Sequence, residues 1–225
     1  MAPLFAVACA AAAIAMTVLW AWQTRMPRPG LADAAWPIVT GGLAVLYASA
    51  AVSPPTRRLP IAWMIGSWGA RLGVHLLWGD VLTRPAVEQN REPLWHFESR
   101  ALVAVFFSLP ALIVSVDRDP TLSIVDFIGG SLWLIGFWGV TTADRQRMRW
   151  EKERAAPVAD SDVRDGVCRI GLWRYIPRAS DVFELVTWSG IGLFAWWSPL
   201  GWVAIACPLA VAYGLVSAGT RSAHP

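Results

Sequence analysis

The chain has 225 residues, of which 56% are hydrophobic and 16% are charged, and its formal net charge is +3. About a quarter of the residues in a soluble domain are usually charged, so this composition excludes an ordinary water-soluble fold and favours a membrane protein. The positive charge does not indicate a nucleic-acid partner, because no aromatic-basic recognition module accompanies it.

Seven apolar segments approach the roughly 20 residues that a helix needs to cross about 30 Å of hydrocarbon. They are Leu4–Trp22, Ala35–Ser53, Leu59–Leu82, Ala101–Val116, Leu122–Val140, Val182–Trp197 and Leu200–Val216. Backbone polar groups in lipid must be satisfied within their own segment, so these segments are predicted to be helices. We therefore expect an all-α fold, a polytopic bundle of about seven transmembrane helices in a single integral-membrane domain, residues 1–225.

The last connection and the first segment have features of their own. Because Ser198 and Pro199 separate the last two segments, we expect a tight hairpin with almost no loop there. The first segment could instead be a cleaved signal peptide, but no Lys or Arg precedes it and its apolar run is long for that role.

Basic residues are distributed unequally among the connections. Most of them follow the first, third and fifth segments, whereas the opposite side has Arg57, Arg58 and Arg118. The positive-inside rule then predicts a multi-pass protein of the plasma (inner) membrane, with the N-terminus outside and the C-terminus in the cytoplasm. The long connections Thr83–Ser99 and Thr141–Ala179 would be cytoplasmic, and long polar connections are where function is expected.

The tryptophans are placed as in a membrane interface, and the cysteines and histidines suggest no metal site. Several tryptophans fall near segment ends, which is typical of the interfacial belt: Trp22, Trp36, Trp78, Trp95, Trp150, Trp196 and Trp197. The three cysteines and three histidines lack the spacing of a zinc site.

Ionisable residues inside apolar segments cost several kcal/mol unless they are paired or hydrated. Arg71 and His75 are four residues apart and share one helix face, with Ser67 and Trp78 on the same face. One interpretation is a polar cavity wall that contacts a substrate or cofactor oxygen. The other is a structural pair satisfied by helix carbonyls or by Asp126.

A second group of polar residues flanks the last long connection. Asp144 and Gln146 begin an alternating run of arginines, which could hold phosphates through bidentate hydrogen bonds or simply face solvent. Asp181 and Glu184 fit a capping box at the start of the next helix. No glycine-rich phosphate loop occurs, which excludes a Rossmann or P-loop site.

These motifs resemble those of the steroid 5α-reductase family, and most closely its bacterial branch, which is carried as a domain of unknown function. The resemblance rests on Gly136-Phe137, Ala143-Asp144-x-Gln146, Gly171-Leu172-Trp173-Arg174-Tyr175 and Phe183-Glu184. Asp33-x-x-Trp36 and Trp68-x-x-Arg71-Leu72-x-x-x-His75 are similar to the N-terminal half. Membrane methyltransferases that act on isoprenylcysteine or phospholipid share the helical hairpin of this superfamily.

The resemblance implies a lipid-side cavity for a lipid-like apolar substrate, and NADPH that enters from the cytoplasm. Hydride would go to a carbon–carbon double bond conjugated to a carbonyl, with a donor for the developing enolate oxygen. The cofactor residues carried over are Asp144, Gln146, Arg174, Tyr175, Arg178 and Ser180. The catalytic candidates are Arg71, His75 and Glu184, of which Glu184 would also line the cofactor site.

The chain departs from the family pattern Arg-Tyr-Ser-Arg-His-Pro-Asn-Tyr in the run that begins at Arg174. The His, Pro, Asn and Tyr positions hold Arg178, Ala179, Ser180 and Asp181. A glutamate usual four residues before Asp144 is Val140, and we expect the family's C-terminal tail to be missing. Three functions therefore stay open: an altered NADPH-dependent reductase, a non-catalytic protein that binds membrane lipid or a partner helix, and a methyltransferase that uses S-adenosylmethionine.

Overall fold

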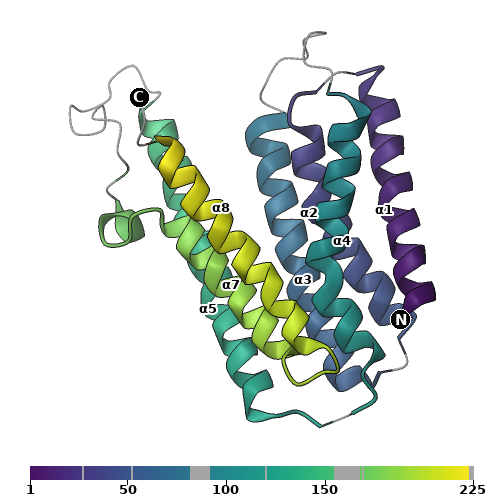
Figure 1. The fold of residues 1–225 in the computed structure, drawn as a ribbon. Helices are drawn as coiled ribbons and strands as arrows, with labels where there is room; N and C mark the ends of the chain where they lie inside the picture. The colour runs from purple at the N-terminus through teal and green to yellow at the C-terminus, as the bar shows by residue number, and fades with distance from the viewer. Residues whose placement is uncertain are drawn as a thin grey trace. The chain divides into compact units, whose positions relative to one another are not determined.

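The structure is a computed structural model that describes residues 1–26, 28–51, 53–81, 92–119, 121–154, 168 and 170–222. These ranges contain seven α-helices and no strand, so the predicted all-α fold is confirmed (Figure 1). The helices are α1 (Ala2–Gln23), α2 (Leu31–Ser49), α3 (Pro55–Leu76), α4 (Leu94–Val116), α5 (Ile124–Arg154), α7 (Ala179–Ala195) and α8 (Ala206–Ser222). Three short helical turns accompany them: η1 (Leu77–Val81), η3 (Gly171–Arg174) and η4 (Gly201–Ile205).

Several of these helices suit a membrane. Within the described residues, four are long and apolar enough to cross one: α1, α2, α4 and α5. This confirms a membrane-embedded protein. α3 carries Arg57, Arg58 and Arg71, and α7 and α8 have 17 residues each, so membrane crossing by these three stays a prediction.

The chain divides into two compact units. Unit 1 consists of Met1–Ile124 with Ala195–Ala204, and unit 2 consists of Val125–Phe194 with Ile205–Pro225. Unit 1 thus holds α1 to α4, and unit 2 holds most of α5, α7 and α8. The expected single domain over residues 1–225 stays a prediction.

Close contact between α2 and α3 organises unit 1. A side chain on Gly69 would overlap the Pro37 carbonyl oxygen, so the helices can touch only because this position is glycine. The Trp36 ring lies 5.6 Å from both Trp68 and Phe107, measured between centroids, which joins α2, α3 and α4. Trp36 is therefore a packing residue of this cluster and not only a member of an interfacial belt.

Trp150, a second tryptophan assigned to the belt, is buried on α5. By contrast, Trp22, Trp78, Trp95, Trp196 and Trp197 are all exposed. Exposure is what an interfacial or lipid-facing position requires. The interfacial position of these tryptophans stays a prediction.

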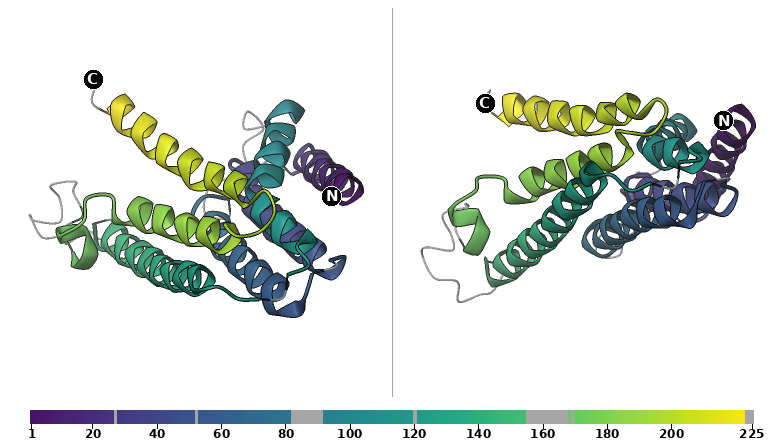
Figure 2. Two further views of the ribbon diagram at one scale, coloured as in Figure 1. Left: turned by 60° about the horizontal axis from the view of Figure 1, so that its bottom comes forward. Right: turned by 90° about the horizontal axis from the view of Figure 1, so that it is seen from below.

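Unit 2 is built on an antiparallel pair, α5 and α7, which lie side by side in both views of Figure 2. The buried residues of α5 are three or four positions apart over most of its length: Asp126, Gly129, Trp133, Gly136, Val140 and Ala143. This spacing of about 3.5 residues is typical of helices that pack along a left-handed seam. A Cβ added to Gly136 would lie 2.5 Å from the Thr187 backbone nitrogen, so glycine permits the close approach.

Two helix boundaries differ from the sequence prediction. α5 runs on to Arg154, well past Val140 where the predicted apolar segment ends, because the charged residues after Trp150 continue the helix. However, α8 begins at Ala206 and not at Leu200, and the almost loop-free hairpin is wrong. Pro199 lacks the N–H that would extend α7, and the chain turns through Leu200, which has a φ of 65°, into η4 before α8 begins.

Candidate functional site

The motif Gly171-Leu172-Trp173 docks on the last turns of α5. The Leu172 backbone N–H donates to Gln146 Oε1 at 2.8 Å, and the Trp173 indole Nε1–H donates to the Ala143 carbonyl oxygen at 2.9 Å. Gly171 has a φ of 54°, and any Cβ there would overlap the Gln146 amide. Glycine is needed at this position for both its left-handed backbone and its closeness to α5.

The start of α7 is tied to α5 by a second polar contact. Ser180 Oγ donates to Asp144 Oδ1 at 2.7 Å. Asp144, Gln146 and Ser180 were all predicted as cofactor residues, and the structure brings them to the same end of the α5–α7 pair. Their role in holding a cofactor stays a prediction.

Arg174 and Tyr175 are exposed beside this contact region, with 78% of Tyr175 accessible. The Arg174 guanidinium carbon lies 5.9 Å from the centroid of the Tyr175 ring. The Arg147 guanidinium carbon lies 5.8 Å from the centroid of the Trp173 ring. The order of the motifs in the sequence predicts that Arg174 and Arg178 face Asp144 or Gln146. Gln146 Oε1 accepts from the Leu172 N–H, and Asp144 Oδ1 accepts from the Ser180 hydroxyl. A contact of Arg174 with either residue stays a prediction.

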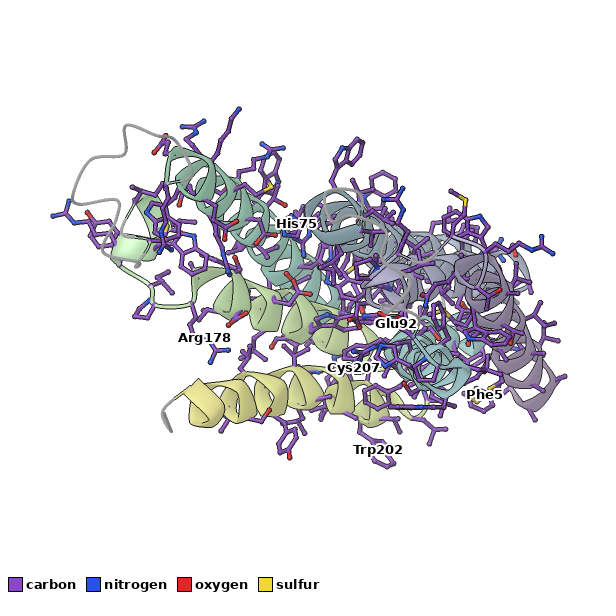
Figure 3. The ribbon with its side chains drawn as sticks, turned by 90° about the horizontal axis from the view of Figure 1, so that it is seen from above. Phe5, His75, Glu92, Arg178, Trp202 and Cys207 are labelled. Carbon is purple, nitrogen blue, oxygen red and sulfur yellow. The ribbon has the colours of Figure 1, made fainter. Side chains whose placement is uncertain are left out.

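Arg178 also takes a position that the sequence did not predict. Its Nε donates to Asp181 Oδ2 at 2.6 Å, and its Nη1 donates to the Leu215 carbonyl oxygen of α8 at 2.8 Å. Figure 3 shows its side chain between α7 and α8. Arg178 therefore links α7 to α8, two of the three helices of unit 2.

The predicted capping box at Asp181 and Glu184 is wrong. α7 begins at Ala179, so Asp181 already lies in the first turn and pairs with the Arg178 side chain. Glu184 is half-buried one turn after Ser180, on the same face of α7. It remains a candidate catalytic residue by resemblance.

Arg71 and His75 belong to unit 1 and lie near the end of α3, where His75 is labelled in Figure 3. Both are half-buried, whereas Trp78 on the same predicted face is 68% exposed. The predicted site residues are thus divided between two units: Arg71 and His75 in unit 1, all others in unit 2. The hydrated interior cavity expected around this pair stays a prediction.

Sequence reasoning missed three contributors to this region. The Ala143 carbonyl and the Leu172 N–H are backbone groups, which no residue type reveals, and the Leu215 carbonyl is 37 residues away from Arg178. The Trp173 indole could have been found, because a tryptophan inside a recurring motif needs a partner for its N–H when it is partly buried. Among the described residues, no group of three or more His, Cys, Asp or Glu side chains is placed to hold a metal ion.

Comparison with known protein families gives a match over most of the chain. Residues 19–223 match a family described as "Protein of unknown function (DUF1295)". No curated protein matches the chain, and no solved structure does. The matched range begins within α1 and extends to the end of α8, so it includes every site residue described above. The chain therefore belongs to the DUF1295 family, whose function is unknown.

Proposed function

We propose that the end of α5, with η3 and the start of α7, binds NADPH, and that the protein reduces a carbon–carbon double bond in a lipid-like apolar enone. The observation that carries this proposal is the docking of Gly171-Leu172-Trp173 on α5. It joins two of the motifs on which the resemblance to the steroid 5α-reductase family rests. It also leaves Arg174 and Tyr175 exposed directly beside the contact.

The donor set suits a phosphate-bearing cofactor. Arg145, Arg149 and Arg174 all expose their guanidinium groups at this end of unit 2. A guanidinium presents several N–H donors in a planar fork that fits phosphate oxygens. The exposed Tyr175 ring offers a flat surface to a base. These residues are therefore the ones that we propose to hold NADPH.

When bound, NADPH would supply a hydride to a double bond conjugated to a carbonyl. The chain must then provide a donor to the oxygen on which negative charge develops, and a proton for the neighbouring carbon. By resemblance, we assign these tasks to Arg71, His75 and Glu184. The substrate would be a lipid-like molecule that reaches the protein from the membrane.

A titration of NADPH into the purified protein in detergent tests this proposal. Energy transfer from tryptophan to the reduced nicotinamide reports binding. Arg174→Ala should weaken the binding of NADPH by about 1–3 kcal/mol, the usual cost of a lost hydrogen bond to a charged group. Arg118→Ala, which removes an exposed arginine from unit 1, is the matched control and should bind as the wild type does. S-adenosylmethionine in the same titration tests the methyltransferase alternative.

One observation favours the non-catalytic alternative. Polar groups that the resemblance assigns to a cofactor are engaged within the protein, since Arg178 contacts Asp181 and Leu215, and Asp144 accepts from Ser180. If the wild type shows no saturable NADPH binding at millimolar concentration, the reductase proposal fails. A gain of binding in the triple variant Arg178→His, Ser180→Asn, Asp181→Tyr would then show that only these contacts had been lost.

A further inference from the structure

The surface of α2 and α3 in unit 1 carries a long apolar groove of about 1390 Å³. Its lining includes small residues, among them Gly42, Ala62 and Gly66, and larger ones such as Val45 and Trp63. Trp63 is 70% exposed and Val45 is 56% exposed. The groove exceeds the roughly 300–1,000 Å³ of most small-molecule sites.

The groove is apolar except at one end. Its two serine hydroxyls are satisfied within their own helices, because Ser49 donates to the Leu46 carbonyl and Ser67 to the Trp63 carbonyl. Among the described residues that line it, Arg58 alone is charged. A cation beside apolar surface attracts an anion, so the charge at this end of the groove favours a ligand with a negative group.

Arg58 has donors to spare. Its Nη1 donates to the Ala51 carbonyl oxygen at 2.8 Å, whereas its Nε is buried and has no acceptor among the described residues. A guanidinium carries five N–H donors, and a phosphate is the anion that best fits this fork. Arg58 also lies in the first turn of α3, where the helix dipole favours an anion. The neighbouring Arg57 does not compete, because it pairs with Asp117.

The length of the groove indicates what fills the rest of it. From Arg58 to Ala70, α3 rises about 18 Å at about 1.5 Å per residue. One leaflet of the hydrocarbon core is about 15 Å thick, half of the roughly 30 Å bilayer core. An acyl chain that begins at a headgroup next to Arg58 therefore matches the groove from end to end. A partner helix would also fit small residues, but it would have to bring its own acid to Arg58.

We infer that this groove is a binding site for one anionic phospholipid of the membrane, with its phosphate on Arg58 and an acyl chain along Gly42, Ala62 and Gly66. The site lies within unit 1 and involves none of the residues proposed to hold NADPH. It would make the stability of α2 and α3 depend on the lipid composition of the membrane.

Native mass spectrometry tests the inference after reconstitution into vesicles with equal amounts of phosphatidylglycerol and phosphatidylcholine. The wild type should retain phosphatidylglycerol in preference to phosphatidylcholine. Arg58→Ala should reduce this preference about tenfold, as expected for one lost charge-assisted contact, and Arg58→Lys should keep part of it. Gly42→Leu should abolish retention of both lipids, because a Cβ at Gly42 meets nothing within 4 Å and the larger side chain enters the groove.

Two controls match these variants. Arg118→Ala removes an exposed arginine outside the groove, and Gly130→Leu fills open space on α5, where a Cβ also meets nothing within 4 Å. Both should retain lipid as the wild type does, and circular dichroism should show unchanged helicity in every variant. If Gly42→Leu does not fold, the two Arg58 variants decide the test.

Four results would overturn the inference. The first is a wild type with no preference between the two lipids, and the second is an unchanged preference in Arg58→Ala. The third is a wild-type dimer that Gly42→Leu converts to a monomer, which would identify a second copy of the chain as the occupant. Displacement of the lipid by inorganic phosphate alone would likewise show a simple anion site in place of a lipid site.

Discussion

Arg57 at the start of α3 and Asp117 at the end of α4 form a buried ion pair, with 2.5 Å between Nη1 and Oδ2. Only 3% of the Arg57 side chain and 7% of the Asp117 side chain are exposed. The other carboxylate oxygen of Asp117 accepts from the Asp119 N–H at 3.1 Å. The pair therefore joins two helices of unit 1 and orders the first residues of the connection that follows α4.

Removal of one partner from this pair should destabilise the protein strongly. Asp117→Ala leaves the buried Arg57 cation without this counter-charge, and we expect a loss of about 3–5 kcal/mol of unfolding free energy. The measurement is thermal or denaturant unfolding in detergent. In the exposed pair Arg147–Glu151, Glu151→Ala should cost under about 1 kcal/mol. If Asp117→Ala and Glu151→Ala lose equal amounts of unfolding free energy, burial does not make the Arg57–Asp117 pair more important for stability than an exposed pair.

The contact between α5 and α7 should depend on glycine at position 136. Gly136→Ala places a methyl group 2.5 Å from the Thr187 nitrogen, so the helices must separate, at a cost of about 1–3 kcal/mol. Gly130→Ala adds the same methyl group on α5 where nothing lies within 4 Å, and it should stabilise by up to about 1 kcal/mol through helix propensity. The difference between the two unfolding midpoints measures the packing effect alone.

Much of the fold could be predicted because apolar length and composition act locally. All seven predicted segments correspond to helices, but their ends moved wherever polar residues continue a helix outside the apolar run. α4, for example, begins at Leu94 and not at Ala101. The turn at Leu200 was missed for a different reason: a positive φ at a leucine depends on the surrounding hydrogen bonds and has no signal in the residue type.

The candidate site was predicted less completely. The resemblance assigned Asp144, Gln146 and the residues after Gly171 to one site, but it could not show which of their atoms would meet. Backbone groups of Leu172 and Ala143 form two of the contacts, and a backbone carbonyl of α8 accepts from Arg178. The buried pair Arg57–Asp117 is equally invisible in the sequence, because both residues look like ordinary loop charges and are separated by 60 positions.

The docking of η3 should depend on Gln146. Gln146→Ala removes the acceptor of the Leu172 N–H, and we expect that amide to exchange with deuterium about five- to tenfold faster, as a hydrogen bond of about 1 kcal/mol is lost. Hydrogen exchange followed by mass spectrometry reports this segment directly. Arg145→Ala on the same part of α5 is the control, since Arg145 is exposed and should leave the exchange unchanged.

The proposed orientation can be tested with the native Cys168. The positive-inside rule places this residue in the cytoplasm, so a membrane-impermeant maleimide should label it only after intact cells are permeabilised. Cys168→Ser should remove the label, which shows that Cys9 and Cys207 do not contribute to the signal. Labelling of Cys168 from outside intact cells would reverse the predicted topology.

Arg178 combines a strained backbone with two side-chain contacts, and substitutions can separate these effects. Its φ of 58° lies in the left-handed region, where a side chain costs about 1–2 kcal/mol relative to glycine. Arg178→Ala loses the contacts with Asp181 and Leu215 but keeps the strain, whereas Arg178→Gly loses the same contacts and relieves it. We therefore expect Arg178→Gly to be about 1 kcal/mol more stable than Arg178→Ala, after allowance for the larger entropy of glycine in the unfolded chain. Unfolding midpoints in detergent give the order. If alanine is as stable as glycine, the backbone is not left-handed at this position, and the start of α7 must differ from the one described.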